Sequence, residues 1–322
     1  MKNFTFINKN FLSGLTLIMM IFTDFRSFGK DLKSVEKNPI LPQVATSPTI
    51  QGVIPVAMSP NFGSYIVPLD GTFNMAFFNT DSQANPPGNR TDEGSTSIIA
   101  LPFTFCFYGT NYNACYIEAN GNVSFGATFT PDHFTGFPVG GFPLLAPFLA
   151  DVDNRPGIPA GGLVWLKTTA HSFIVIWDSV GYNFFHTDKL NSFELIITDG
   201  TDPVIGLGNN VAFSYRTMQW TTSDRWGGVN GFGGSPATVG INDGNGVLYS
   251  LIGSFDHAGI DYNGPGGSPS GVGYLQNQNF IFNACPSNPT ITCIPTLSEW
   301  SLIILGFLLV VTGTFFIIRK DA

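Results

Sequence analysis

Charged side chains are scarce in this sequence. They make up 11% of its 322 residues, against about a quarter in an average soluble domain. Basic residues are scarcest in the middle: between Ile40 and Cys293 six of them stand against seventeen acidic residues, a net charge of −11. Such a surface repels nucleic acid and anionic membrane surfaces, so the sequence predicts no nucleic-acid partner.

Motifs for catalysis and metal binding are also missing. The four histidines (His133, His171, His186 and His257) are far apart, and none belongs to an HxH or HExxH pattern. No GxSxG nucleophile elbow and no CxxC pair occurs, which argues against the usual hydrolase and zinc chemistry. The sequence therefore predicts a protein that is not an enzyme and that needs no cofactor or metal.

Cysteine is limited to four residues, which fall into two local pairs. Three connectivities are possible. In an oxidising compartment we expect the local pairing, Cys106 with Cys115 and Cys285 with Cys293, which would staple a hairpin and a loop near the membrane. The alternative is that the thiols are free and buried.

The first sixty residues have the composition of a targeting segment and a linker. Lys2 and Lys9 give a positive start, and residues 11–22 are an apolar stretch of the length found in signal peptides. We expect residues 1–29 to be a signal peptide, with an uncleaved anchor as the alternative. Residues 30–60 contain five prolines and are expected to be an extended linker.

The C-terminal end contains one long hydrophobic run. Residues 302–318 carry no charge and are followed by Arg319 and Lys320. This predicts a transmembrane helix at 301–318, a cytoplasmic tail at 319–322 and a domain outside the membrane. A buried core helix is the alternative.

A short motif stands directly before that run, in the stalk at 285–300. It reads Ile294-Pro295-Thr296-Leu297-Ser298-Glu299-Trp300. Followed by a hydrophobic helix and a basic end, this motif resembles the IPTL-type C-terminal sorting signal of exported bacterial proteins. The resemblance implies export from a Gram-negative-type cell and a sorting peptidase of the exosortase kind as a partner.

Strand signals fill the middle of the chain. Phe103, Phe105 and Phe107 alternate with polar or smaller side chains, and Asn120-Gly121 separates two apolar runs, which is a strong hairpin signal. Further strands are expected at 163–167, 172–180, 192–198 and 211–217. No convincing amphipathic helix lies between residues 61 and 284. The sequence thus predicts an all-β fold, an antiparallel β-sandwich-like domain at 61–284.

Several further motifs occur in this region: LPF at 101–103, YIEANGNVSFG at 116–126, APFLADVD at 146–153, VAFSY at 211–215 and VGINDG at 239–244. Together they resemble a nidogen-like (NIDO) domain over about residues 98–283. The resemblance implies an extracellular module associated with cell–matrix adhesion and not with catalysis.

The candidates for metal ligands are two acidic residues, with Asn154 and the turn at Pro156-Gly157 beside them. Asp151 and Asp153 alternate along an expected strand, so their carboxylates would share one face and could bind calcium. We expect instead that they are solvated residues at a strand end. Arg225 and Trp226 could form a contact surface, but buried tryptophans are commoner than exposed ones, so no binding face is predicted there.

These features predict an exported, membrane-anchored surface protein whose domain mediates cell–matrix or cell–cell adhesion. Its partners would be a matrix or surface protein or polysaccharide, the membrane, and the sorting peptidase. Two alternatives stay open, a calcium-assisted carbohydrate-binding protein and a structural component of a biofilm matrix.

Overall fold

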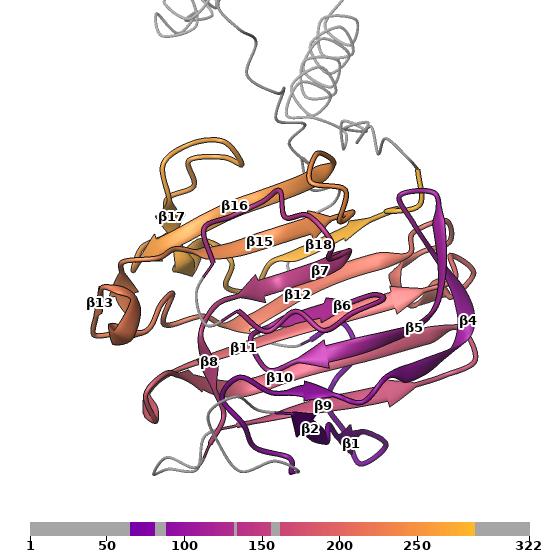
Figure 1. The fold of residues 1–322 in the computed structure, drawn as a ribbon, viewed down its shortest axis with the longest axis horizontal. Helices are drawn as coiled ribbons and strands as arrows, with labels where there is room; N and C mark the ends of the chain where they lie inside the picture. The colour runs from indigo at the N-terminus through magenta and orange to yellow at the C-terminus, as the bar shows by residue number, and fades with distance from the viewer. Residues whose placement is uncertain (1–64, 81–87, 132–133, 156–161, 287–322) are drawn as a thin grey trace, which may run out of the picture. The chain divides into compact units, whose positions relative to one another are not determined.

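A computed structural model describes residues 65–80, 88–131, 134–155 and 162–286 (Figure 1). Within them the chain is built from β-strands, and its helical elements are three short 3₁₀ turns, η1 (Pro203–Ile205), η2 (Asp224–Trp226) and η3 (Val272–Tyr274). The prediction of an all-β fold is confirmed.

Two large sheets and one small ribbon make up the fold. The seven-stranded sheet contains β1 (Asn74–Met75), β8 (Val152–Asp153), β9 (Leu163–Thr168), β10 (Ser172–Tyr182), β11 (His186–Thr198), β12 (Val211–Thr217) and β18 (Asn279–Phe282). The nine-stranded sheet contains β2 (Phe78–Thr80), β3 (Ser95–Thr96), β4 (Ile99–Phe107), β5 (Thr110–Glu118), β6 (Asn122–Ser124), β7 (Leu144–Leu149), β15 (Ala237–Asn242), β16 (Tyr249–His257) and β17 (Ser270–Gly271). The ribbon is β13 (Gly228–Val229) with β14 (Phe232–Gly233).

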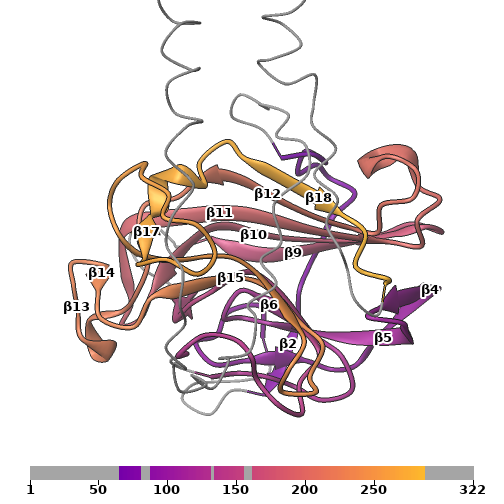
Figure 2. The same ribbon diagram turned by 90° about the horizontal axis from the view of Figure 1, so that it is seen from above.

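The two sheets lie face to face and share one core (Figure 2). The strands of the seven-stranded sheet run in the order β1-β9-β10-β11-β12-β18, with β8 paired to β10. In the other sheet the order is β17-β16-β15-β7-β6-β5-β3-β2, with β4 paired to β5. The pairing of β16 with β17 is parallel, and the other described pairs are antiparallel.

The predicted aromatic alternation forms β4. Its phenylalanines are buried, while Pro102 before Phe103 and Thr104 after it face solvent. The Asn120-Gly121 turn joins β5 to β6, as predicted, with Glu118 opposite Asn122. Gly121 has a φ of +79°, and a Cβ there would lie 1.9 Å from the carbonyl oxygen of Phe148, so this turn tolerates only glycine.

Strand β10 is buried on both faces. Phe173, Val175 and Trp177 point into the core between the sheets, as their shared face predicts. Ile174 and Ile176 point the other way, into a second apolar cluster. An uncovered sheet face would show polar side chains here, so something must cover the outer face of this sheet.

The segment 65–73 provides that cover. Tyr65 and Phe73 belong to the second cluster, and buried Glu194 of β11 accepts hydrogen bonds from the backbone N–H groups of Ile66 and Val67 at 2.9 and 3.1 Å. Burial raises the pKa of Glu194 to about 8, against the opposing effect of these two hydrogen bonds. A buried carboxyl thus fixes the N-terminal end of the described domain to the sheet.

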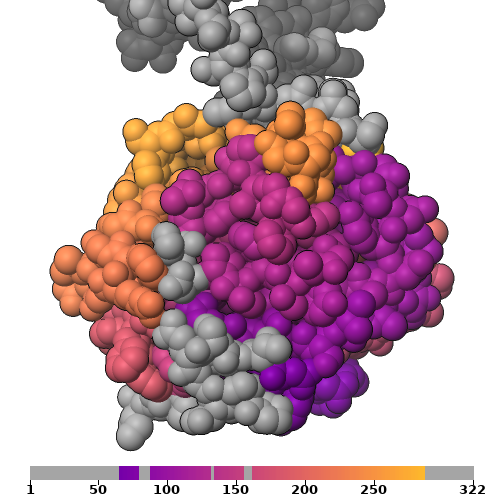
Figure 3. All heavy atoms as spheres, in the orientation of Figure 1, coloured from indigo at the N-terminus to yellow at the C-terminus, as the bar shows by residue number. Residues whose placement is uncertain are grey.

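Four phenylalanines pack on Leu144 and Ala146, on the outer face of the other sheet: Phe129, Phe134, Phe137 and Phe142. The magenta atoms in the middle of Figure 3 belong to this part of the chain. Buried Glu118 accepts a hydrogen bond from the backbone N–H of Phe129 at 3.0 Å. Burial also raises the pKa of Glu118, to about 7. Farther along, the side chain of Asn242 bonds to both the N–H and the C=O of Val139.

The disulfide of this domain is not the predicted one. Cys106 is bonded to Cys285, and Cys115 is a buried free thiol. The prediction of a Cys106–Cys115 pair is wrong because Cys115 lies opposite Ile99 in the β4–β5 register, roughly 23 Å along the strand from Cys106. The predicted Cys285–Cys293 pair is likewise wrong, since Cys285 is already bonded; Cys293 itself lies outside the described residues.

The predicted export, linker and membrane segments cannot be compared with the fold. Residues 1–29, 30–60, 301–318 and 319–322 all lie outside the described residues. Among the residues that the structure does describe, no helix is long and apolar enough to span a bilayer.

Candidate functional site

Both aspartates of the predicted calcium pair are buried. Asp151 follows β7 and is 4% exposed, and Asp153 at the end of β8 is 1% exposed, so the expectation that they are solvated is wrong. The segment before β3 covers them: Asn154 N–H donates to the carbonyl oxygen of Thr91 at 3.1 Å, and Thr91 N–H donates to Asn154 Oδ1 at 2.6 Å. Sequence reasoning missed this cover because it comes from sixty residues upstream.

Two of the covering residues are acidic. Asp92 and Glu93 are buried beside Asp151, and one carboxylate oxygen from each of the three lies within 4.8 Å of the others. Asp153 is not part of this group. The amide of Asn120 donates to Glu93 Oε2 at 2.6 Å and so links the group to the β5–β6 turn. The sequence signal for these two residues, adjacent carboxylates before a strand, is too common to single them out.

Asp153 is held instead by an arginine. Arg155 donates from Nε to Asp153 Oδ1 at 2.9 Å and from Nη2 to Asp153 Oδ2 at 2.6 Å. The same Nη2 reaches Asp92 Oδ2 at 2.8 Å. The arginine side chain is 11% exposed, so this is a buried bidentate ion pair shared by two carboxylates.

The three-carboxylate group places three potential ligand oxygens together. Oxygen atoms this close can ligate a hard divalent cation such as calcium, whose oxygen ligands lie at about 2.3–2.6 Å. The residues that could hold a cation are therefore Asp92, Glu93 and Asp151, and not the pair expected from the sequence.

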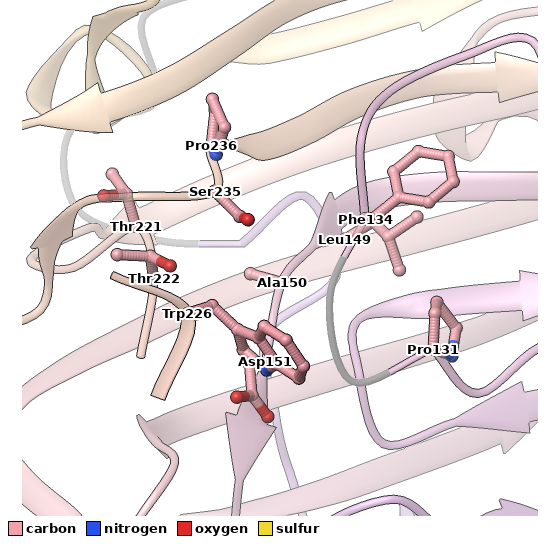
Figure 4. Close-up of a pocket in the computed structure, with 10 residues that line it drawn as sticks. All are labelled: Pro131, Phe134, Leu149, Ala150, Asp151, Thr221, Thr222, Trp226, Ser235 and Pro236. Atoms are coloured by element: carbon pink, nitrogen blue, oxygen red, sulfur yellow. The ribbon is translucent and has the colours of Figure 1, made fainter. Parts of the chain in front are cut away.

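A small pocket opens beside Asp151. Its lining includes Trp226, Thr221 and Thr222 from one side and Pro131 and Phe134 from the other (Figure 4). The pocket has room for about one water molecule or ion. The acidic group thus lies next to the surface but is not open to a large ligand.

The arginine also supports two exposed aromatic rings. Phe184 and Phe185 form the turn between β10 and β11 and are 66% and 42% exposed. The Arg155 guanidinium carbon lies 5.8 and 4.1 Å from their ring centroids, and Phe185 N–H donates to Asp153 Oδ2 at 2.9 Å. Arg155 and Asp153 therefore hold the turn in place while its rings face solvent.

The remaining candidates lie elsewhere. His171 contacts Asp199, His186 lies between Asp188 and Asp224, and His257 lies between Asp256 and Asp261, all on the surface. Hydrogen bonds to the carboxylates of Asp256 and Asp261 raise the pKa of His257. Trp226 is half-buried with the Arg225 guanidinium 5.2 Å from its ring. The sorting motif, residues 294–300, lies outside the described residues.

Comparison with known families identifies two regions of the chain. A family model described as NIDO related matches residues 69–265, and the model of the IPTL-CTERM motif matches residues 292–314. Both resemblances found in the sequence are confirmed. No solved structure matches the chain.

Among the curated relatives, the chain is similar to alpha-tectorins. It is 31% identical to that of Gallus gallus, 32% to that of Mus musculus and 31% to that of Homo sapiens, each over 198 residues. The match covers 51% of this chain and 9% of each relative's length. Together with the sorting motif, these matches support an exported protein that is extracellular or at the cell surface.

Proposed function

Because the chain belongs to the NIDO-related family, we propose that it is a non-enzymatic surface protein whose β domain mediates cell–matrix or cell–cell adhesion. Its IPTL-type tail sorts and anchors it. The division of the chain goes with this proposal: a signal peptide at 1–29, a linker at 30–60, the β domain at 61–284, a stalk at 285–300, a membrane helix at 301–318 and a cytoplasmic tail at 319–322.

The observation that carries the proposal is the exposed pair Phe184–Phe185. Aromatic residues, phenylalanine included, and arginine are enriched in protein interfaces. Here the two rings contact each other edge to face, with centroids 4.5 Å apart, on a turn braced by Arg155. A rigid apolar contact loses little conformational entropy on binding, which favours affinity.

The chemistry of the domain fits the outside of a cell. The Cys106–Cys285 bond is stable in an oxidising compartment and rare in a reducing one. The acidic surface disfavours direct adsorption to anionic membranes. The disulfide and the acidic surface are both consistent with adhesion to a specific partner outside the cell.

Retention of cells under flow tests the proposal. Cells producing the full-length protein are washed at rising shear on matrix from the producing organism's surface, beside cells producing the Phe184→Ala/Phe185→Ala variant at equal surface density. We expect at least tenfold fewer cells of the variant to stay attached. Leu207→Ala, an apolar residue 74% exposed on another turn, should behave as wild type.

Two outcomes would contradict the proposal. Equal retention of the two strains would remove the aromatic pair from the contact and would favour the structural matrix component. If the Leu207→Ala control lost as many attached cells, retention would depend on exposed apolar residues in general and not on the aromatic pair.

The proposed sorting is tested by mass. Mature protein should end between Ile294 and Trp300 if the sorting peptidase removes the helix, whereas full-length mass with a protected C-terminal tag would show a retained anchor.

A further inference from the structure

A second surface feature lies at the end of the domain where β13 and β17 are labelled in Figure 1. It is a groove of about 320 Å³, within the size range of small-ligand sites. One side comes from the start of β11, the residues after β12, and β14; the other comes from the residues after β16 and from η3. The groove therefore exists only when both sheets are folded together.

The wall on the second side combines two glycines with two apolar residues, Ala258 and Val272. Gly259 packs directly on Gly273, where a Cβ would lie 2.6 Å from the Gly259 carbonyl oxygen. No side chain projects from these two glycines, so backbone groups form part of this wall. A flat ligand can approach such a wall closely and can bond to its backbone groups.

The opposite wall combines one aromatic ring with polar groups. Phe232 is half-buried, packed on the main core from β14. Asp188 and Lys189 form an ion pair of 2.6 Å, and the lysine Nζ lies 6.0 Å from the Phe232 ring centroid. Gln219 accepts a hydrogen bond from Leu190 N–H through Oε1, which directs its remaining N–H donors to solvent or ligand.

We propose that this groove binds a short neutral oligosaccharide. Sugar rings present an apolar face that packs on an aromatic ring and a rim of hydroxyls that both donate and accept hydrogen bonds. The groove offers an aromatic ring, a carboxylate acceptor, an ammonium donor and an amide donor. The charges of Asp188 and Lys189 offset each other, so the site has no net charge to attract a charged ligand.

Other ligand classes fit less well. Nucleic acid and anionic glycans meet the net charge of −11 between Ile40 and Cys293. A peptide helix needs a continuous apolar groove, whereas the apolar part here is one ring flanked by an ion pair. The inference extends the proposed adhesion function by naming a class of surface ligand, and it rests on that function for its biological role.

Binding to immobilised oligosaccharides tests the inference. Full-length protein in mild detergent is applied to a panel of neutral, sialylated and sulfated oligosaccharides, and the dissociation constants of neutral members are then measured in solution. We expect binding to neutral members only. Phe232→Ala should weaken it at least tenfold and Gln219→Ala severalfold, while Phe77→Ala, which removes an aromatic ring that is 50% exposed outside the groove, should change it less than twofold.

The controls separate folding from binding. Gln219 is exposed, so its variant keeps the fold even if Phe232→Ala lowers the melting temperature. No neutral binding, equal binding of sulfated members, or wild-type affinity in Gln219→Ala would each overturn the inference. If the protein binds no oligosaccharide while cells producing the wild type and both groove variants stay attached normally, the groove is not a ligand site. The adhesion function would then remain in place.

Discussion

Removing the Cys106–Cys285 bond should cost the domain much of its stability. The bond joins residues 179 apart in the sequence. In the chain-entropy model, closing a loop of that length restricts the unfolded chain by about 5 kcal/mol. For a domain of about 200 residues this corresponds to a fall in melting temperature of roughly 10–20 °C.

The assay is thermal unfolding of the exported full-length protein and of its Cys106→Ala/Cys285→Ala variant. Peptide mapping without reductant should first recover one crosslinked pair, Cys106 with Cys285. Treating the wild type with reductant should lower its melting temperature to that of the variant, since both changes remove the same crosslink.

Cys115→Ala is the matched control. This cysteine is buried and free, and burial raises the pKa of its thiol, so it should resist alkylation until the domain unfolds. Its removal should cost only the loss of one small buried group, about 1 kcal/mol. A double variant as stable as wild type, or a Cys115→Ala loss of equal size, would refute the reasoning.

Three further predictions follow from the fold and the site. Burial raises the pKa of Glu118 to about 7 and of Glu194 to about 8, so the folded protein binds more protons than the unfolded one between about pH 4.5 and 8. The free energy of unfolding, measured in urea, should therefore fall as the pH rises through that window. Glu194→Gln should make this dependence on pH weaker. Arg155→Met leaves Asp92 and Asp153 buried without their arginine and should destabilise by about 3–5 kcal/mol, against about 0.5 kcal/mol or less for the exposed control Arg225→Met; equal losses would contradict the buried ion pair. Gly121→Ala should cost about 1–3 kcal/mol more than Gly126→Ala, because both have a positive φ but only the first meets backbone within 4 Å; similar urea midpoints would mean that the turn can move away from Phe148.

The strands could be predicted because their signals are local. Alternation of Phe103, Phe105 and Phe107 with polar or smaller side chains is enough to specify a strand with one buried face, and Asn120-Gly121 specifies its own turn. The buried Ile174 and Ile176 could also be read as a second apolar face. The segment that covers that face could not be predicted, because residues 65–73 lie about a hundred residues upstream.

The site depended on contacts between distant segments. Asp151 and Asp153 alternate in the sequence, yet Asp153 pairs with Arg155 and Asp151 joins Asp92 and Glu93. That division depends on where residues 91–94 lie, with Thr91 bonded to Asn154 and Gly94 bonded to Ala119. The same limit applies to cysteine: its pairing depends on the register of β4 with β5 and on β18 ending beside Cys106, and spacing along the chain reports neither.

The disulfide also determines how the domain would carry a pulling force. Cys285 is near the last described residue, on the side of the chain that leads to the sorting motif at 292–314, so a force applied through that part of the chain would reach the domain there. Without the bond, the load would fall on β18, an edge strand held by its ladder to β12, and its hydrogen bonds would open one after another. With the bond, part of the load passes to β4 in the opposite sheet. The sheet edge is then not separated one hydrogen bond at a time, because the force acts as shear between the two sheets. The residues between the two cysteines also cannot extend under the force.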